Sequence, residues 1–264
     1  MDPRLSERQN DILARIGARG AQQIDRLARD YGLTTQSIRR DINVLCALGL
    51  ARRLHGGVDL PVLPQSTSIN ARARLHGAAK RRIAARVAQD IPDGSTVFLG
   101  IGTTVRYTAE ALREHSGLTV VTNNVEVALI LGDVEEIELH LAGGVWRAND
   151  RDLVGAETIR YFEKFHATHA VVGAGGLHPT SGALDFSYDE AQITNAILLN
   201  SRTRYLVADV SKWQGTAAVR VAPFSQFSFF VTDVMPPEQA HENSLTESGV
   251  AVVLCGSRTG SAQD

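Results

Sequence analysis

The sequence predicts a chain of two unlike units. A small, mostly helical unit spans residues 1–59, a linker spans residues 60–75, and an α/β unit with a mostly parallel sheet spans residues 76–264. Three observations lead to this prediction. Amphipathic helical patterns fill the first fifty residues, apolar runs alternate with helical patterns after residue 93, and charge is shared unequally between the two parts.

The formal net charge of −2 conceals a segregation of charge along the chain. Residues 1–89 carry 16 Lys and Arg against 7 Asp and Glu, whereas residues 90–264 carry 11 against 22. A basic front part joined to an acidic remainder is typical of a polyanion-binding module attached to a different domain. An ordinary solvated surface explains scattered arginines, but it does not explain their segregation.

Cysteine usage and hydropathy indicate the compartment. Cys46 and Cys255 are the two cysteines, and neither has Cys or His neighbours at metal-ligand spacing. The sequence therefore predicts no metal site, no disulfide framework and a reducing cytoplasm. No apolar run approaches the ~18 residues of a membrane span, and the start "MDPRLSERQND" lacks the apolar segment of a signal peptide. We expect a cytoplasmic protein without membrane contact.

Three helical patterns follow one another closely at the start of the chain. The first, "LSERQNDILARIGARG", opens with Ser6 and has Gln9 three residues later, which is a capping-box pattern. The second, "AQQIDRLARDYG", has an amphipathic spacing and ends at Gly32. The third, "LTTQSIRRDINVLCALG", follows after a very short turn, with Thr34 as its expected N-cap.

The third helix presents polar side chains opposite its apolar stripe, as follows from a rotation of ~100° per residue. The guanidinium group of arginine matches phosphate oxygens and guanine edges, and the side-chain amides of Gln and Asn match adenine edges. This arrangement is typical of a helix-turn-helix with its recognition helix. The alternative is that these polar side chains are ordinary solvent-exposed residues of a surface helix. The predicted DNA contacts on this helix are Thr35, Gln36, Arg39, Arg40 and Asn43.

The next segment, "GLARRLHGGVDL", predicts a two-stranded wing with a Gly-Gly turn. Its basic residues are expected against the sugar-phosphate backbone. The predicted wing contacts are Arg52, Arg53, His55, Gly56 and Gly57. Asp41 lies nearer the buried side of the preceding helix, where we expect it to pair with a local arginine because phosphate repels a carboxylate.

The second unit begins after "DLPVLPQSTSINARARLHG", whose prolines and lack of periodicity predict the linker. The pattern in "INARARLHGAAKRRIAARVAQDI" predicts one helix. Near-continuous apolar strands then alternate with helices, which predicts a parallel sheet covered on both faces. The expected strands are "STVFLGIG", "LTVVTNN", "IELHLAGG", "ATHAVVGAGGL", "TRYLVADVSK", "FSFFVTDV" and "VAVVLC".

Small and polar residues follow the carboxyl ends of these strands, where sheets of this kind bind ligands. In "GIGTT", free amides, hydroxyls and a helix dipole suit a phosphate. Arg147 and Lys212 are expected to add positive charge, so a phosphorylated sugar or polyol is the predicted ligand. The alternative is that each glycine is needed only for a tight connection between a strand and the next element. The predicted ligand residues are Gly102, Thr103, Thr104, Thr122, Asn123, Asn124, Gly143, Gly144, Arg147, Gly173, Gly175, Asp189, Glu190 and Lys212.

A dinucleotide cofactor is not expected. "GIGTTV" and "GAGGLH" each match part of the G-x-G-x-x-G pattern. The first lacks the third glycine and an acidic residue after the following strand, and the second runs into Pro179 instead of a helix. We predict no cofactor.

Both parts of the chain resemble the DeoR family of bacterial transcriptional regulators. "SIRRDINVLCALGLARRLHGGV" is similar to the family's recognition helix and wing, and "GTT", "LTVVTNN", "LAGGVWR", "LVGAET", "DEA" and "ADVSK" follow the order of its sensor domain. The resemblance implies a ribose-5-phosphate-isomerase-like fold and a phosphorylated effector that loosens operator binding. It also implies a lost carboxylate, since Gly100 stands where the family commonly has Asp.

The sequence thus predicts a DNA-binding transcriptional regulator that is not an enzyme. We expect a repressor of a carbohydrate or polyol operon, released by a phosphorylated sugar. We also expect a homo-oligomer, because one module buries too little surface for operator affinity. A sugar-phosphate isomerase with an accessory DNA-binding domain is the alternative, with Asp185, Asp189, Glu190 and Lys212 as acid–base groups. A domain that only dimerises is a third possibility.

Overall fold

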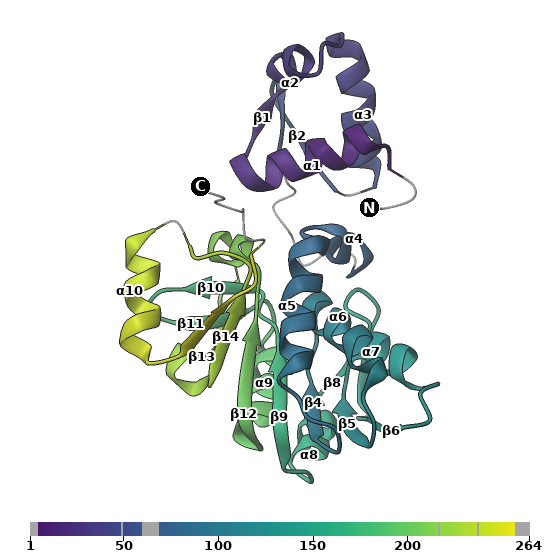
Figure 1. Ribbon diagram of the computed structural model, residues 1–264, viewed down its shortest axis with the longest axis vertical. Coiled ribbons are helices and arrows are strands. Elements are labelled where there is room, and N and C mark those ends of the chain that lie inside the picture. Colours follow the sequence, from purple (N-terminus) through teal and green to yellow (C-terminus); the bar gives the residue numbers. More distant parts are fainter. Residues whose placement is uncertain (1–4, 49, 60–68, 216, 237, 257–264) are drawn as a thin grey trace, which may run out of the picture. The chain divides into compact units, whose positions relative to one another are not determined.

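The chain folds into two compact units, residues 1–77 and residues 78–264, in a computed structural model (Figure 1). No helix in the described part of the chain is long and apolar enough to cross a bilayer. The residues described are 5–48, 50–59, 69–215, 217–236 and 238–256.

The first unit combines helices with a small antiparallel sheet, as predicted for a winged helix-turn-helix. Its helices are α1 (Glu7–Arg19), α2 (Ile24–Asp30) and α3 (Thr35–Ala47). The sheet has the order β1-β3-β2, with β1 (Gln22–Gln23), β2 (Arg52–Leu54) and β3 (Gly57–Asp59). The sequence did not predict β1, because two glutamines have little strand character until they pair with β3.

Local chemistry defines the helix ends of this unit. The Ser6 hydroxyl accepts from the Gln9 N–H, and the Gln9 side chain accepts from the Ser6 N–H at 3.0 Å, so the predicted capping box is confirmed. Thr34 caps α3 by accepting from the Ser37 N–H. Gly32 makes the turn between α2 and α3 with a φ of +62°, a conformation that favours glycine.

The second unit is built on a seven-stranded sheet in which every neighbouring pair is parallel. This confirms the predicted α/β class. The order is β15-β14-β12-β9-β4-β5-β6, so the chain reverses direction across the sheet between β4 and β9. Ligands bind at such switch points. The strands are β4 (Thr96–Leu99), β5 (Leu118–Thr122), β6 (Ile137–Leu141), β9 (Ala167–Val172), β12 (Ser201–Val207), β14 (Phe229–Thr232) and β15 (Ala251–Leu254).

Helices cover both faces of this sheet (Figure 1). One face packs against α5 (Gly77–Gln89), α6 (Thr103–Ala111) and α7 (Val125–Leu131). The other packs against α8 (Ala156–Phe162), α9 (Tyr188–Leu199) and α10 (Gln239–Ser248). Where the sequence predicts one helix before β4, the structure has α4 (Ile69–Arg74) and α5, separated at His76, whose φ is +56°.

Two hairpins, which the sequence did not predict, extend the loops that follow β6 and β9, and a further unpredicted strand follows β12. β7 (Val145–Arg147) pairs with β8 (Asp152–Val154), and β10 (Gly176–His178) pairs with β11 (Gly182–Asp185). β13 (Val219–Ala222) joins β11 in a second small sheet. Strands of three or four residues are shorter than the usual five or six, so their alternation is too brief to recognise.

Candidate functional site

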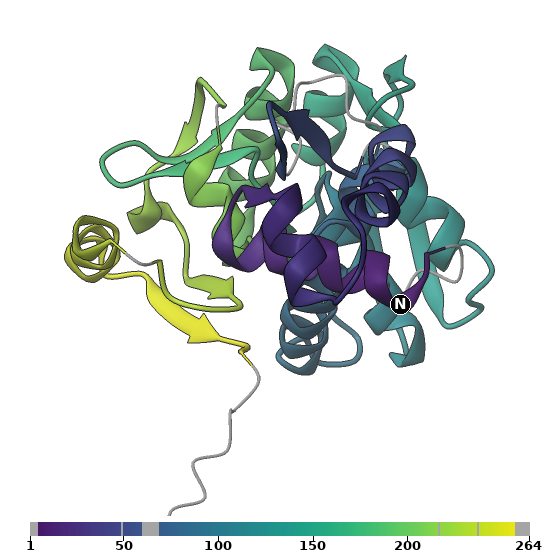
Figure 2. The same cartoon turned by 90° about the horizontal axis from the view of Figure 1, so that it is seen from above.

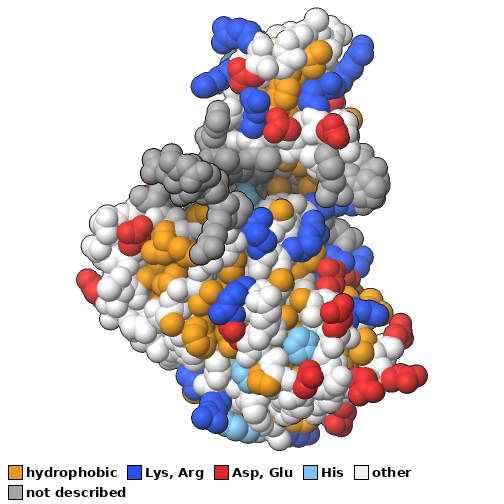
Figure 3. Space-filling view, viewed as in Figure 1, with side chains coloured by type: hydrophobic (Ala, Val, Ile, Leu, Met, Phe, Trp, Pro, Cys, Tyr) orange, Lys and Arg blue, Asp and Glu red, His pale blue; other side chains and the backbone are white. Residues whose placement is uncertain are grey.

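The helix α3 presents all its predicted DNA contacts on one exposed face. Its apolar stripe of Ile38, Ile42 and Leu45 is fully buried in the core of the first unit. Lys and Arg side chains stand out on the surface of this unit (Figure 3). The exposed predicted contacts on α3 are Thr35, Gln36, Arg39, Arg40 and Asn43.

The wing exposes its basic residues in the same way. Its buried member, Gly57, has a structural role, because a Cβ there would lie 2.8 Å from the Gln22 carbonyl oxygen of β1. Arg52 is paired across the wing with Asp59 at 3.0 Å. The exposed predicted wing residues are Arg52, Arg53, His55 and Gly56.

Asp41 fixes the recognition helix against α1. Its buried carboxylate accepts from Arg8 Nε at 2.7 Å and from Gln9 Nε2 at 3.0 Å. The predicted ion pair is confirmed, but the arginine lies 33 residues away instead of nearby in the sequence. Gln9 therefore both caps α1 and holds Asp41, so the orientation of α3 depends on the first helix.

The start of α6 offers free backbone donors at the switch point. Gly102 is its N-cap with a φ of +112°, and no side chain caps the helix. The first amides of a helix have no partner within it. A Cβ at Gly102 would meet nothing within 4 Å, while Thr103 and Thr104 are buried behind it. This geometry suits the anion site that the sequence predicts.

The polar segment after β5 is used mostly within the fold. The Thr122 hydroxyl donates to the Leu99 carbonyl at 2.7 Å and accepts from the Asn124 N–H at 3.0 Å. Asn124 caps α7 and donates to the Gly100 carbonyl at 3.4 Å. Asn123 donates to Leu153 at 2.9 Å, yet its buried Oδ1 has no hydrogen-bond partner in the described part of the chain. Only Asn123 therefore keeps a free acceptor.

Several predicted glycines allow close approach of other groups. A Cβ at Gly144, whose φ is +155°, would lie 2.3 Å from Thr158 Oγ1, and one at Gly175 would lie 2.9 Å from the Phe186 ring. Gly143 holds α8 through its carbonyl, which accepts from Thr158 at 2.8 Å. Gly144 and Gly175 thus have packing roles, whereas Gly143 contributes a backbone hydrogen bond.

Gly100 faces the core. A Cβ at this position would lie 3.3 Å from Val172 Cγ1 and 3.6 Å from Ile197 Cδ1. A side chain there would begin among apolar atoms at the end of β4. The geometry gives no support to a sugar contact from position 100, which the resemblance implied.

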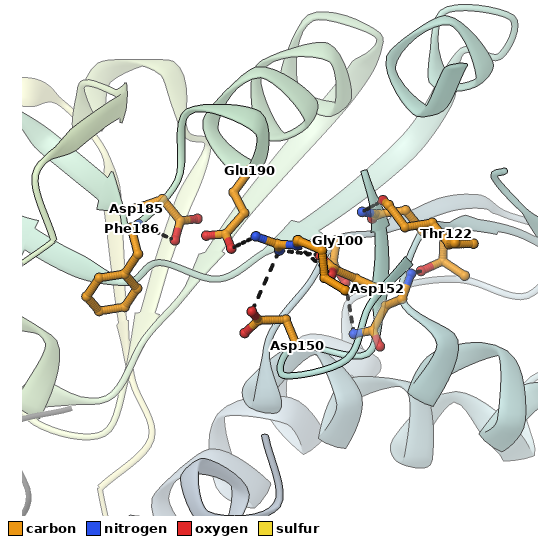
Figure 4. A network of polar contacts seen from close by, with 11 residues as sticks. Gly100, Thr122, Asp150, Asp152, Asp185, Phe186 and Glu190 are labelled. Carbon is orange, nitrogen blue, oxygen red and sulfur yellow. Dashed lines mark hydrogen bonds and ion pairs between the residues drawn. The ribbon is translucent and has the colours of Figure 1, made fainter. Parts of the chain in front are cut away.

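Arg147 lies among the carboxylates of Asp150, Asp152 and Glu190, which are labelled in Figure 4. It donates to both oxygens of buried Asp152, at 2.9 Å and 2.6 Å, and its Nη1 lies 2.5 Å from Glu190 Oε1. Asp150 is 3.9 Å away. We predicted that Arg147 supplies free positive charge to a phosphate, but its charge is neutralised by acids. Burial is the reason, because a buried charge is stable only when it is paired.

Glu190 in this cluster has a raised pKa. Burial raises the pKa of Glu190, a hydrogen bond and charge repulsion from Asp185 raise it further, and Arg147 lowers it, so the pKa is about 8. Burial also raises the pKa of Asp152, although Arg147 opposes the shift. Glu190 and Asp185 therefore form an acid pair that can both donate and accept hydrogen bonds.

A second buried carboxylate near the site was missed by the sequence reasoning. Glu126 is paired with Arg151 and lies 3.4 Å from Arg106 of α6. Arg151 has a φ of +52°, an uncommon conformation for a residue other than glycine. Arg151 is 25 residues from Glu126 in the sequence, so no local pattern signals the pair.

The remaining predicted ligand residues are spread more widely. A Cβ at Gly173 would lie 3.3 Å from the Ile101 carbonyl, which places this turn beside the start of α6. Asp189 is exposed in the first turn of α9. Lys212 is half-buried in the short helix η2 (Val210–Gln214). The next residue, Trp213, stacks on His241 of α10 with ring centroids 4.4 Å apart.

Direct contacts join the central part of the site. The segment after β5 bonds to the end of β4 through Asn124 and to β8 through Asn123, and β7 bonds to α9 through Arg147. These contacts link the ends of β4 and β5, the β7–β8 hairpin and the start of α9. Thr122 and Gly143 are hydrogen-bonded within the fold.

Comparison with known proteins finds a family match for each of the two units. Residues 8–62 match a DeoR-like helix-turn-helix domain, and residues 75–234 match the DeoR C terminal sensor domain. The chain is 35% identical over 250 residues to the glycerol-3-phosphate regulon repressor of Escherichia coli strain K12, across 95% of this chain and 99% of that protein. It is 33% identical over 247 residues to the HTH-type transcriptional repressor CsqR of the same strain, across 94% of each.

Among solved structures, ribose 5-phosphate isomerase A from Methanocaldococcus jannaschii aligns with a TM-score of 0.39 and 16% identity, over 52% of this chain and 54% of that one. The family matches and the repressor relatives confirm the resemblance seen in the sequence. The chain belongs to the DeoR family, with a helix-turn-helix domain followed by the family's sensor domain.

Proposed function

We propose that the protein is a transcriptional repressor whose first unit binds operator DNA and whose second unit binds a phosphorylated sugar or polyol that releases it. The observation that carries the proposal is the exposed face of α3, with adjacent arginines Arg39 and Arg40 on a helix-turn-helix domain. The names of two relatives, both repressors, support repression over activation. The protein is proposed to act in the cytoplasm as a homo-oligomer without catalysing a reaction.

The proposed DNA contacts are of two kinds. On α3, the arginines and Asn43 read base edges in the major groove. On the wing, Arg53 and His55 meet phosphate oxygens, which positions the domain without reading sequence. Arg52 contributes less directly, because Asp59 already binds its guanidinium. Asp41 takes no part in binding but sets the angle of α3 through Arg8.

The proposed effector lies with its phosphate at the start of α6 and its hydroxyl groups toward the acid pair. The free amides there and the helix dipole favour an anion. A phosphate beside Asp150 and Asp152 would be repelled, so this orientation is preferred to the reverse. Asn123 Oδ1 is the proposed acceptor for one hydroxyl. Glu190 binds another.

Release from DNA follows from linkage. If the effector binds the arrangement that does not fit the operator more tightly, operator affinity falls by the ratio of the two effector affinities. A homo-oligomer makes this coupling stronger, since paired helix-turn-helix units must match two half-sites at a fixed spacing.

The test is operator binding with and without effector. Labelled DNA from upstream of the gene and its neighbouring operons is titrated with the protein in excess competitor DNA, and anisotropy is read. Glycerol 3-phosphate is the first probe because a relative's name contains it; ribose 5-phosphate is the second, and unphosphorylated glycerol is the matched control. We expect specific binding that a phosphorylated probe weakens. Binding no tighter than to competitor would contradict the DNA-binding role.

The acid pair favours a second candidate function, that of a sugar-phosphate isomerase. A carboxyl group with a pKa of about 8 can serve as an acid or a base near neutral pH. Incubation with pentose and hexose phosphates, followed by chromatography of the sugars, separates the two functions. We expect saturable binding without turnover. Turnover that Glu190→Gln abolishes would establish the enzyme instead.

A further inference from the structure

The strand β15 is an open edge of the large sheet. It pairs with β14 on one side and, as the last strand in the order, has no strand on the other in the described part of the chain. Seen from above, this yellow strand lies at the margin of the second unit (Figure 2). Its residues, Ala251 to Leu254, are all apolar, and Leu254 is 54% exposed. An uncharged edge of this kind is a template for pairing with another strand.

The hydrogen bonds to β14 show which backbone groups face outward. The Ala251 N–H donates to Ser228 at 3.2 Å, and the Cys255 N–H donates to Thr232 at 2.8 Å. In a parallel pair alternate residues face the neighbour, so the N–H and C=O groups of Val252 and Leu254 point to the open side. These groups have no partner among the residues that the structure describes.

The opposite edge of the sheet is protected. β6 carries the exposed Glu138, and the loop before it holds the exposed acids Asp133, Glu135 and Glu136. Charged side chains on an edge strand prevent pairing, because two such edges repel each other. One edge strand of the sheet thus carries a charge that opposes pairing, whereas the other edge strand carries none. This difference indicates that the uncharged edge has a partner.

We propose that β15 pairs antiparallel with β15 of a second copy of this chain, so that the sheet runs continuously through a two-fold dimer. The inference rests on the proposed function, which calls for paired DNA-binding units. The edge is self-complementary, since β15 itself carries no charged side chain and has apolar side chains on both faces. A cation lies just beyond the strand, where Arg82 Nε donates to the Cys255 carbonyl at 2.8 Å. Apolar side chains also gather on the side that carries α10 and β15 (Figure 3).

The occupant is a second copy instead of the following segment of the same chain. Residues 257–264, "SRTGSAQD", contain no apolar side chain larger than alanine and are poor in strand-forming types. Their composition therefore matches the apolar Val252 and Leu254 poorly. A second β15 covers them with side chains of the same kind on the same face.

The geometry also sets the register. A two-fold axis normal to the sheet keeps each face on its own side, so the axis passes through either Val252 or Val253. When the axis passes through Val253, Val252 of each copy lies opposite Leu254 of the other copy, so two such pairs form. Both pairs consist of outward-facing residues, which gives four hydrogen bonds. Centred on Val252, only one outward pair forms within β15. The register on Val253 is therefore preferred.

Disulfide trapping tests this arrangement on the full chain without DNA. The background is Cys46→Ala with Cys255→Ala. In a non-hydrogen-bonded antiparallel pair the Cα atoms are about 4.5 Å apart, which permits a disulfide. We expect Val253→Cys to form a covalent dimer under mild oxidation. We expect Val252→Cys not to do so, since its counterpart lies beyond the ~7 Å limit.

Analytical ultracentrifugation gives a second measurement. We expect the unmodified chain to sediment as a dimer or larger, and Leu254→Lys to shift it toward a smaller species. Leu141→Lys, on the protected edge, is the matched control and leaves the size unchanged. A monomeric wild type, or a dimer that neither traps at Val253 nor responds to Leu254→Lys, would overturn the proposal. If the protein dimerises through another surface and still binds its operator, the proposed function stands and only the β15 interface is wrong. Failure of the interface can therefore be distinguished from failure of the proposed function.

Discussion

The recognition helix and the sensor site use arginine in opposite ways. Arg39 and Arg40 are exposed, and neither has an ion pair to a residue that the structure describes. Arg147, which the sequence also predicts as a phosphate contact, is held by Asp152 and Glu190. An exposed guanidinium remains available to an incoming anion, whereas a half-buried one must be paired inside the fold. Burial decides which arginines can bind a phosphate.

The comparison also separates two ways of recognising a phosphorylated molecule. Charge dominates binding to DNA, because the polymer releases counterions when cations approach. The proposed effector is small and needs direction more than charge, which the helix amides and the acid pair are proposed to supply. The predictions below test this contrast.

The largest expected effect is the loss of stability on removing the half-buried Arg147. Arg147→Ala leaves the fully buried carboxylate of Asp152 without its cation, which is expected to lower the free energy of unfolding by ~3 kcal/mol. Chemical denaturation monitored by circular dichroism measures it. Arg40→Ala is the matched control and should change stability by less than ~0.5 kcal/mol. Equal stability of the two variants would mean that the two arginines do not differ as described.

The next effect is the loss of operator affinity on removing an exposed arginine. Arg40→Ala is expected to weaken specific binding by ~1–3 kcal/mol if it reads a base, and to leave stability unchanged. Anisotropy titrations at several salt concentrations separate the two kinds of contact, since loss of a phosphate contact lowers the salt slope by about one. Arg202→Ala, an exposed arginine of the second unit, is the control. Unchanged affinity and slope would remove Arg40 from the interface.

Measured per pH unit, the smallest effect is a pH dependence of stability that originates in Glu190. Its pKa is about 8 in the folded protein, against 4.5 as the ordinary value. The folded state therefore binds more protons between these values, and stability falls as pH rises through that window, by at most ~1.4 kcal/mol per pH unit. Thermal unfolding of wild type and Glu190→Gln from pH 5 to 8.5 measures it. The variant, which resembles the protonated acid, should have a flatter profile; identical profiles would argue against the raised pKa.

How much could be predicted differs between the two units for a physical reason. The recognition helix is a contiguous segment, so its period of ~3.6 residues separates Ile38 and Ile42 from Arg39 and Arg40 without knowledge of the fold. In the sensor unit, the strands and the sheet class follow from apolar runs. The position of Arg147 against Glu190 depends on a hairpin too short to recognise and on a helix that begins 41 positions later.

Pairings over long distances in the sequence account for the other differences. Asp41 was expected to pair, but its partner Arg8 comes from α1. Thr122 and Asn124 were assigned to a ligand because they follow a strand, yet the neighbouring strand and helix take their hydrogen bonds. Gly102 and Thr103 retain the predicted geometry because a strand, a glycine turn and a helix are adjacent in the chain.

The stacking of Trp213 on His241 has a practical consequence for measuring effector occupancy. The chain has two tryptophans. Trp146 is 49% exposed on the hairpin that carries Arg147, while the indole nitrogen of Trp213, next to Lys212, is buried. The two indoles therefore lie in different environments, one on the Arg147 hairpin and one beside Lys212, and are expected to emit at different wavelengths. Replacing Trp146 with phenylalanine isolates one signal, so intrinsic fluorescence can follow ligand titration without any attached dye.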